Sequence, residues 1–134
     1  NMKKTIEENG EKIIDSWTLN CIPFDSSKFL GTLYITKDNL YFDAQFDSSL
    51  SGLMKSVATS AVVGSGHALI VSSRILEDWK GKGYMFIDKK SIKNIEEKSS
   101  FFKKTVVLTL EDDSVIIFDY GMMGIKKLVE AIKQ

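Results

Sequence analysis

The stretch GTLYITKDNLYFDAQF at residues 31–46 predicts two antiparallel strands joined by a tight polar turn. Leu33 and Ile35 alternate with polar or aromatic residues in its first half, and Leu40 and Phe42 do so in its second half. A period of two is typical of a strand with one buried face. The Lys-Asp-Asn sequence between the halves supplies side chains that favour turns. The stretch therefore indicates a β-hairpin whose alternating residues serve a core.

A second hairpin pattern, TVVLTLEDDSVIIF, occupies residues 105–118 and is followed by a helical pattern at residues 125–132. Both apolar runs are rich in β-branched and aromatic residues, and the acidic run between them is typical of a turn. Shorter strand patterns lie at residues 11–19, 84–87 and 92–95. The last pattern predicts an amphipathic helix that caps the sheet. Its apolar positions, spaced i, i+3, i+4 and i+7, are Ile125, Leu128, Val129 and Ile132.

Residues 47–82 interrupt the strand patterns and predict a helical hairpin inserted after the third strand. The first half has apolar residues at helical spacing on one face and mostly serine and threonine on the other. A Gly-Ser-Gly sequence separates it from a second helical pattern that contains Ile75, Leu76 and Trp79. The apolar face of the first half consists of Leu50, Leu53, Met54, Val57, Ala58, Ala61 and Val62.

Two interpretations of this insert stay open. No formally charged residue lies between Ser56 and Ser73, but serine, threonine, glycine and histidine dilute the segment too much for a transmembrane span. In the first interpretation the insert covers an open edge or mouth of the barrel, or packs on a second copy of the chain. In the second it lies on a bilayer or enters it shallowly. Surface helices usually carry more lysine and arginine than this polar face does, which favours packing or self-association.

The composition indicates one globular domain over residues 1–134. Of the 134 residues, 43% are hydrophobic, and there is one proline. The one cysteine, Cys21, cannot form an internal disulfide, and its apolar neighbours predict a buried thiol. The first residues, Asn-Met-Lys-Lys, hold no apolar stretch of the kind that signal peptides carry. We therefore expect a cytoplasmic location.

The charge is balanced overall but uneven along the chain. Eighteen basic and eighteen acidic residues give a formal net charge of zero. Residues 80–104 nevertheless hold eight lysines against three carboxylates. Such a segment suits an anionic membrane, an acidic partner or RNA. The alternative is a solvated lysine face that prevents edge strands from pairing with other chains.

The residues that catalysis requires do not form a recognisable set. His67 is the only histidine, so a Ser-His or Cys-His pair would depend on it alone and a metal site would lack ligands. No phosphate-binding glycine motif occurs. Asp112 and Asp113 lie in a predicted turn, where aspartate is favoured for its geometry. We expect a non-catalytic protein without cofactor or metal and, since it lacks an arginine-aromatic platform, without nucleic acid as a partner.

The order of these segments resembles that of GRAM domains, which belong to the pleckstrin-homology superfold. The resemblance rests on GTLYITKDNLYF at residues 31–42 and on KKSIKNIEEKSSFFKKTVVLTLEDDSVIIF at residues 89–118, and it covers about residues 11–46 and 84–134. It implies a mainly β, α+β fold, an antiparallel barrel of about seven strands capped by a C-terminal helix. Here the helical insert at residues 47–82 is added after the third strand.

The resemblance and the charge pattern together predict peripheral association with anionic membrane lipid. Phosphoinositide-binding relatives usually carry several basic residues in the loop between their first two strands, but residues 20–28 offer only Lys28 and include Asp25. The sequence Phe-Phe-Lys-Lys at residues 101–104 instead joins two apolar rings to two cations, which suits a lipid interface. The alternative places the rings in the core. The candidate lipid-binding residues are Lys82, Lys98, Phe101, Phe102, Lys103 and Lys104.

The alternative function is protein–protein interaction or self-assembly through the insert. The partner is then another protein or a second copy of this chain. An exposed apolar patch larger than roughly 600 Å² on the insert would favour this function. The candidate residues are Leu50, Leu53, Met54, Val57, Ala61 and Val62.

Overall fold

The computed structural model describes residues 1–24, 27–45, 70–100, 103–121 and 124–134 of the chain. These residues form seven strands, three α-helices and one short 3-10 helix. The strands are β1 (Ile13–Phe24), β2 (Ser27–Thr36), β3 (Asn39–Ala44), β4 (Met85–Asp88), β5 (Ile92–Ser99), β6 (Lys104–Leu110) and β7 (Val115–Asp119). The helices are α1 (Met2–Glu8), α3 (Ser73–Lys82), α4 (Lys126–Lys133) and the 3-10 helix η1 (Lys89–Ser91).

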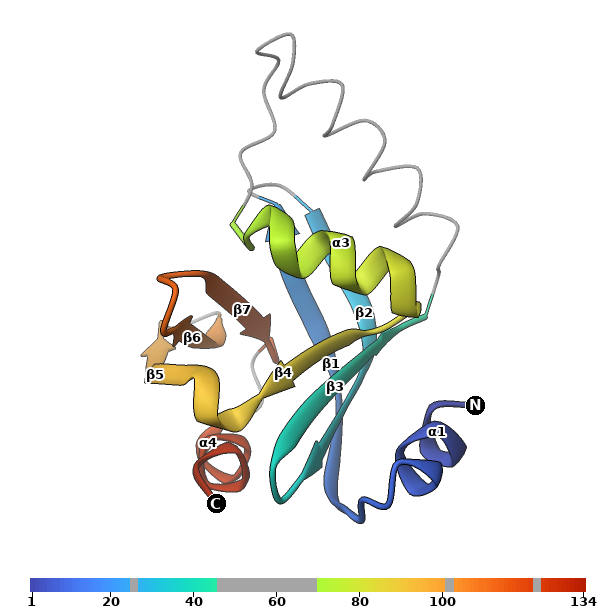
Figure 1. Cartoon of the computed structure of the whole chain (residues 1–134). Coiled ribbons are helices and arrows are strands. Elements are labelled where there is room, and N and C mark those ends of the chain that lie inside the picture. Colours follow the sequence, from blue (N-terminus) through green and yellow to red (C-terminus); the bar gives the residue numbers. More distant parts are fainter. Residues whose placement is uncertain (25–26, 46–69, 101–102, 122–123) are drawn as a thin grey trace, which may run out of the picture.

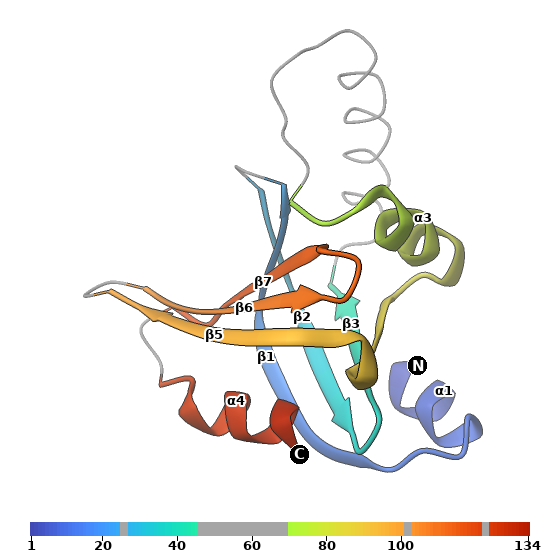
Figure 2. The same cartoon turned by 60° about the vertical axis from the view of Figure 1, so that its left-hand side comes forward.

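All seven strands belong to one antiparallel sheet in the order β4-β3-β2-β1-β7-β6-β5. The twelve-residue β1 joins its two halves, because it pairs with β2 along most of its length and with β7 through Asn20 and Cys21. The sheet bends so that both halves contribute to one core, in which the rings of Phe42 and Phe118 lie 6.0 Å apart (Figures 1 and 2).

The sheet is mainly antiparallel β structure, as the sequence predicts, but it is open and not a closed barrel. Its edge strands are β4 and β5, which are not neighbours in the described sheet. The four-residue β4 is too short to extend far along a second partner, and the chain passes through η1 before β5 pairs with β6. The expectation of barrel closure is therefore corrected, because the edges of the two halves do not meet in a hydrogen-bonded ladder.

The β2–β3 hairpin forms as predicted, with Gly31 to Ile35 paired to Leu40 to Ala44. Leu33 pairs with Phe42 and Ile35 pairs with Leu40. All four side chains are fully buried in the main core. The period of two in the sequence therefore identifies the inner face of this hairpin correctly.

The outer face of the same hairpin is also covered, by α1. Tyr41 lies on this face and is only 1% exposed, and it packs with Met2 and Ile6 in a second, smaller hydrophobic cluster. Helix α1 is not predicted by the sequence. A seven-residue helix with only these two buried residues carries too little periodicity to be recognised.

Glu11 joins the segment after α1 to the β2–β3 turn. Its carboxylate accepts hydrogen bonds from Thr36 Oγ1 at 2.6 Å, from Asn39 Nδ2 at 2.7 Å and from the Tyr41 hydroxyl. These three neutral donors come from both sides of the turn. They hold α1 in place over the outer face.

The β6–β7 hairpin and α4 also form where the sequence predicts them. Val106 pairs with Phe118 and Leu108 pairs with Ile116, and all four side chains are buried. The helix then packs its apolar face on the main core, as its spacing predicts. The buried residues of that face are Ile125, Leu128, Val129 and Ile132.

Helix α3 lies across the end of the sheet formed by β1 and β2 (Figure 1). It begins after Ser72, whose side chain accepts a backbone hydrogen bond of 3.3 Å, and it ends at Gly83, whose φ is 85°. Trp79 is buried and packs edge-to-face on Phe29 and Phe42, with ring centroids 6.5 and 5.9 Å apart. The second helical pattern of the predicted insert therefore closes one end of the core.

Strand β1 is longer than the sequence predicts. It continues to Phe24, although a loop was expected over residues 20–28. Pro23 lies where the register with β2 shifts, which is a position that tolerates a residue without an N–H. The loop expectation is wrong because Cys21 pairs with both neighbouring strands, and this pairing outweighs the local signal of the proline.

Two of the predicted segments lie outside the described residues. These are the apolar stripe of the insert and the ring pair Phe101 and Phe102, so the functions assigned to them stay predictions. Within the described ranges, none of the helices is long and apolar enough to cross a membrane. The stripe comprises Leu50, Leu53, Met54, Val57, Ala58, Ala61 and Val62.

Candidate functional site

The lysines that the sequence groups together lie at opposite ends of the β5–β6 pair. Lys98 and Lys104 lie at the free end of the hairpin, where Ser99 pairs with Lys104. Lys82 lies at the end of α3 and lines a hollow with Leu110, which is at the other end of β6. The structure therefore brings Lys98, Lys103 and Lys104 near one another and separates Lys82 from them.

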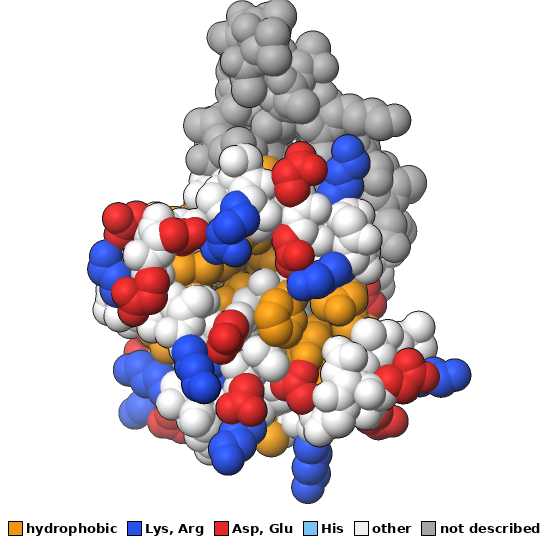
Figure 3. All heavy atoms as spheres, viewed as in Figure 1, with side chains coloured by type: hydrophobic (Ala, Val, Ile, Leu, Met, Phe, Trp, Pro, Cys, Tyr) orange, Lys and Arg blue, Asp and Glu red, His pale blue; other side chains and the backbone are white. Residues whose placement is uncertain are grey.

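Lys82 interacts with side chains close to it, Asp78 and Phe86. Its Nζ lies 3.1 Å from Asp78 and 4.7 Å from the centre of the Phe86 ring. On the face drawn in Figure 3, basic and acidic side chains are interspersed and do not form an area of one sign. Lys82 therefore does not extend a lysine surface toward the hairpin end.

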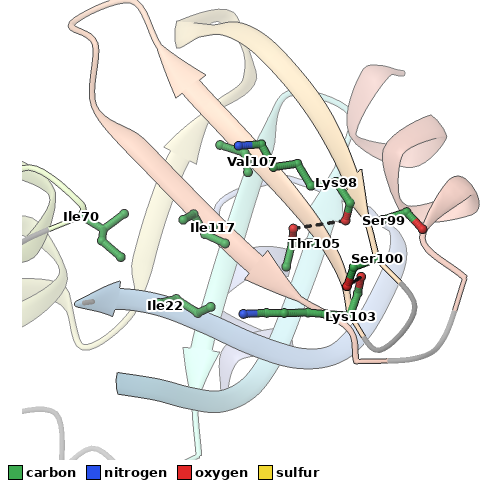
Figure 4. Close-up of a pocket in the computed structure, with 9 residues that line it drawn as sticks. All are labelled: Ile22, Ile70, Lys98, Ser99, Ser100, Lys103, Thr105, Val107 and Ile117. Atoms are coloured by element: carbon green, nitrogen blue, oxygen red, sulfur yellow. Dashed lines mark hydrogen bonds between the residues drawn. The ribbon is translucent and has the colours of Figure 1, made fainter. Parts of the chain in front are cut away.

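An open pocket of about 420 Å³ lies beside the free end of the β5–β6 hairpin (Figure 4). We call it the hairpin pocket. It has an apolar floor and a rim of lysine, serine and threonine. The lining residues are Ile22, Ile70, Lys98, Ser99, Ser100, Lys103, Thr105, Val107 and Ile117.

The pairing of the strands determines which residues form the apolar floor of the hairpin pocket. Val107 pairs with Ile117, and the pairing of Cys21 with Phe118 sets Ile22 next to Ile117. The neighbours of these residues in sequence face the core, so alternation directs Ile22, Val107 and Ile117 to the outer face. The sequence contained a signal for this floor, since VIIF is apolar on both faces of its strand and TVVLTL carries Val107 between two threonines on its outer face.

Lys98 and Lys103 extend from the hairpin end across this floor, with their side chains running in the same direction (Figure 4). Their aliphatic stems cover apolar surface while the ammonium groups remain hydrated. Two hydrogen bonds hold the hairpin end: Thr105 Oγ1 donates to the Lys98 carbonyl at 3.3 Å, and the Ser100 N–H donates to the Lys103 carbonyl at 2.8 Å.

Asp119 is a buried carboxylate at the edge of this site and is 2% exposed. It accepts hydrogen bonds from Lys28 Nζ at 2.8 Å and from the Gly121 N–H at 2.7 Å, and it lies 3.9 Å from Lys103 Nζ. Burial favours its neutral form, but these hydrogen bonds and positive charges outweigh burial and hold the pKa of Asp119 below its ordinary value. One ionised carboxylate therefore positions two lysines.

Lys98, Lys103 and Lys104 are predicted by the sequence, whereas Lys28 and Asp119 are parts of the same site that the sequence does not predict. Lys28 was considered only as a residue of the expected loop. Its partner Asp119 is 91 positions away in sequence, and no local pattern connects the two. The pairing of β1 with both β2 and β7 brings them together.

Cys21 lies in the main core and is 0% exposed. Burial raises the pKa of its thiol far above the ordinary value, so the thiolate that would attack a substrate or bind a metal is disfavoured. The prediction of a buried thiol is confirmed. Among the described residues, no three histidine, cysteine or acidic side chains gather as a set of metal ligands.

Comparison with known proteins gives a fold but no family. No protein-family model matches the chain, and no curated protein matches its sequence. The crystal structure of the C-terminal domain of an unknown protein from Leishmania infantum aligns with a TM-score of 0.63 at 15% sequence identity. The alignment covers 99% of this chain and 93% of that one. The shared property is a mainly β fold.

Proposed function

We propose that this chain is a GRAM-like, pleckstrin-homology-type module that binds anionic membrane lipid peripherally and is not an enzyme. The proposed contact is the hairpin pocket with its lysines. The element order supports the superfold assignment, because seven antiparallel strands precede a helix that packs on the core. Helix α1 is an addition to the pattern that the resemblance implies, and the open sheet departs from its barrel.

One observation carries this proposal: Lys98 and Lys103 run in parallel over an apolar floor (Figure 4). A lipid headgroup presents the complementary pair of features, an anionic phosphate beside apolar carbons. The ammonium groups suit the phosphate, and Ile117 with its apolar neighbours suits the adjoining carbons. Lys28, held by Asp119, adds a third cation at the edge.

Two aromatic residues next to these lysines in the sequence are also candidates for the membrane contact. In the sequence, Phe101 and Phe102 lie between Lys98 and Lys103, in the segment that joins β5 to β6. Aromatic rings are favoured in the headgroup layer of a bilayer. We therefore keep Phe101 and Phe102, as candidates from the sequence, in the proposed membrane contact.

Vesicle co-sedimentation tests this proposal. We expect the protein to bind phosphatidylcholine vesicles that contain phosphatidylserine and to bind them less as salt is added. The double variant Lys98→Gln/Lys103→Gln should partition roughly thirtyfold less, since each lysine near an anionic surface contributes about 1 kcal/mol. Binding that is equal for vesicles with and without phosphatidylserine would contradict the proposal.

A matched control is available on α3. The double variant Lys80→Gln/Lys82→Gln removes the same charge from another part of the surface. It should retain the binding of the unmodified protein. An equal loss in both double variants would mean that net charge alone drives adsorption and that the hairpin pocket is not a site.

A further inference from the structure

A second pocket, of about 390 Å³, lies at the opposite end of β5, beside the end of α4. Three parts of the chain meet there: the β2–β3 turn, η1 with the start of β5, and the last turn of α4. We call it the helix pocket. All its lining residues lie within the described ranges. Its basic residues are Lys37, Lys89, Lys90 and Lys133.

The four lysines of the helix pocket are not neutralised locally. Within the described ranges, none of them forms an ion pair with a carboxylate. Asp38 is the acidic side chain that lines the pocket, and the end of α4 adds a partial negative charge. The pocket therefore keeps an excess of positive charge in a protein whose formal net charge is zero. Basic residues elsewhere that do form such pairs are Lys28, Arg74, Lys82, Lys93 and Lys103.

Lys89 joins the three parts of the pocket. Its backbone N–H donates to the Asp38 carbonyl at 2.9 Å, and its Nζ donates to the Ala131 carbonyl in α4 at 3.2 Å. Partial burial lowers the pKa of Lys89, and the nearby charge of Asp38 opposes that shift only in part. The ammonium group is thus partly removed from water without a carboxylate bound to it. An incoming anion would supply that missing partner.

The remaining wall of the helix pocket is apolar. Ile92 and Ile95 are half-buried at the start of β5, and Ile132 of α4 is 2% exposed. All three belong to, or pack against, the main core. Their positions are therefore fixed by the fold, and the half-buried Ile92 and Ile95 offer a firm surface to carbon atoms of a ligand.

We propose that the helix pocket binds a small organic molecule that carries two or more phosphate groups. A volume of about 390 Å³ falls in the range of small-molecule sites, which is about 300–1,000 Å³. Several unpaired ammonium groups favour a polyvalent anion over a single charge, and lysine is a common point-charge partner of phosphate. Ile92 and Ile95 receive the organic part. This site is separate from the hairpin pocket and does not depend on lipid binding there.

Two-dimensional NMR titration with ATP, pyrophosphate and orthophosphate tests the assignment. We expect saturable shifts of the Lys89, Ile92 and Ile95 amides with ATP and pyrophosphate, and weaker shifts with orthophosphate. Lys89→Gln should weaken ATP binding roughly tenfold, as expected for the loss of one charge-assisted hydrogen bond. The exposed Lys90→Gln tests the same site without removing the contact to α4.

The control is Lys82→Gln, which should bind ATP as the unmodified protein does. Three outcomes would overturn the proposal. The first is the absence of saturable shifts at the helix pocket, and the second is an equal loss of affinity in the control. The third is tighter binding of a glutamate-rich peptide than of ATP at the same amides, which would assign the pocket to an acidic protein. Vesicle binding by Lys89→Gln remains a separate measurement, so failure here and failure at the hairpin pocket are distinguishable.

Discussion

The β2–β3 and β6–β7 hairpins have alike inner faces and different outer faces. Each hairpin buries two pairs of apolar residues in the same core. The outer face of the first is covered by α1, which buries Tyr41. The outer face of the second, with Val107 and Ile117, lines an open pocket. Two hairpins with alike inner faces therefore differ outside, where one is covered by a helix and the other offers a candidate binding surface.

The largest expected effect tests the likeness of the two inner faces. Phe42→Ala and Phe118→Ala should each lower the free energy of unfolding by about 3–5 kcal/mol, because each ring is fully buried. Their rings lie 6.0 Å apart, so the double variant should lose less than the sum of the two. Urea unfolding measures all three values. A large loss of stability for only one ring, or full additivity of the two losses, would show that the two inner faces do not contribute alike to one core.

The second prediction tests the difference between the outer faces. Ile6→Ala should destabilise the protein by about 2–3 kcal/mol, since Ile6 belongs to α1, packs with Tyr41 and is 0% exposed. Val107→Ala should cost less than about 1 kcal/mol, because Val107 is only half-buried. The same urea experiment compares them. If the two costs are equal, the floor of the hairpin pocket is covered in solution and the proposed lipid contact there fails.

The smallest effect concerns the turns of the two hairpins. Glu11 holds the β2–β3 turn, whereas Arg74 of α3 holds the β6–β7 turn through Asp112, with Nη2 at 2.8 Å and Nε at 3.2 Å from Oδ2. Hydrogen bonds from Ser114 and then from Arg74 lower the pKa of Asp112 to about 2. Arg74→Met should raise this pKa toward its ordinary value, and NMR titration of the Asp112 carboxyl carbon measures the shift.

The sign of the related stability change follows from linkage. The folded-state pKa of Asp112 is below the unfolded value of about 3.9, so its contribution is present above that pH. It is lost as the pH falls from about 3.9 through about 2. Lys93→Met, which removes the neighbouring ion pair with Asp113, serves as the control and should leave Asp112 unchanged. An unchanged Asp112 in the Arg74 variant would show that α3 does not hold this turn.

The elements that could be predicted from the sequence are those with a strong local period. Both hairpins, the apolar face of α4 and the buried Cys21 were predicted in this way, and Trp79 lies on a helix at the expected spacing. The elements that were missed carry a weak or misleading local signal. Helix α1 is short, and Pro23 suggested an end to β1 that the sheet does not have.

The residues of the candidate site also fall into those that the sequence predicts and those that it does not. Lys98, Lys103 and Lys104 could be named from the sequence because they are close to one another along the chain. Lys82 belongs to the same lysine-rich segment, but strand β5 carries the chain away from it. Lys28 and Asp119 could not be named, since sheet pairing alone makes them neighbours.

The sequence by itself determined that this protein is mainly β, which of its strands face a core, and that a helix follows them. These properties depend on side-chain period, which is a property of each segment alone. Only the tertiary structure decided that the sheet stays open, that α1 covers one outer face and that the lysines divide between two pockets. Those properties depend on contacts between residues far apart in sequence, whose pairing energies no local pattern expresses.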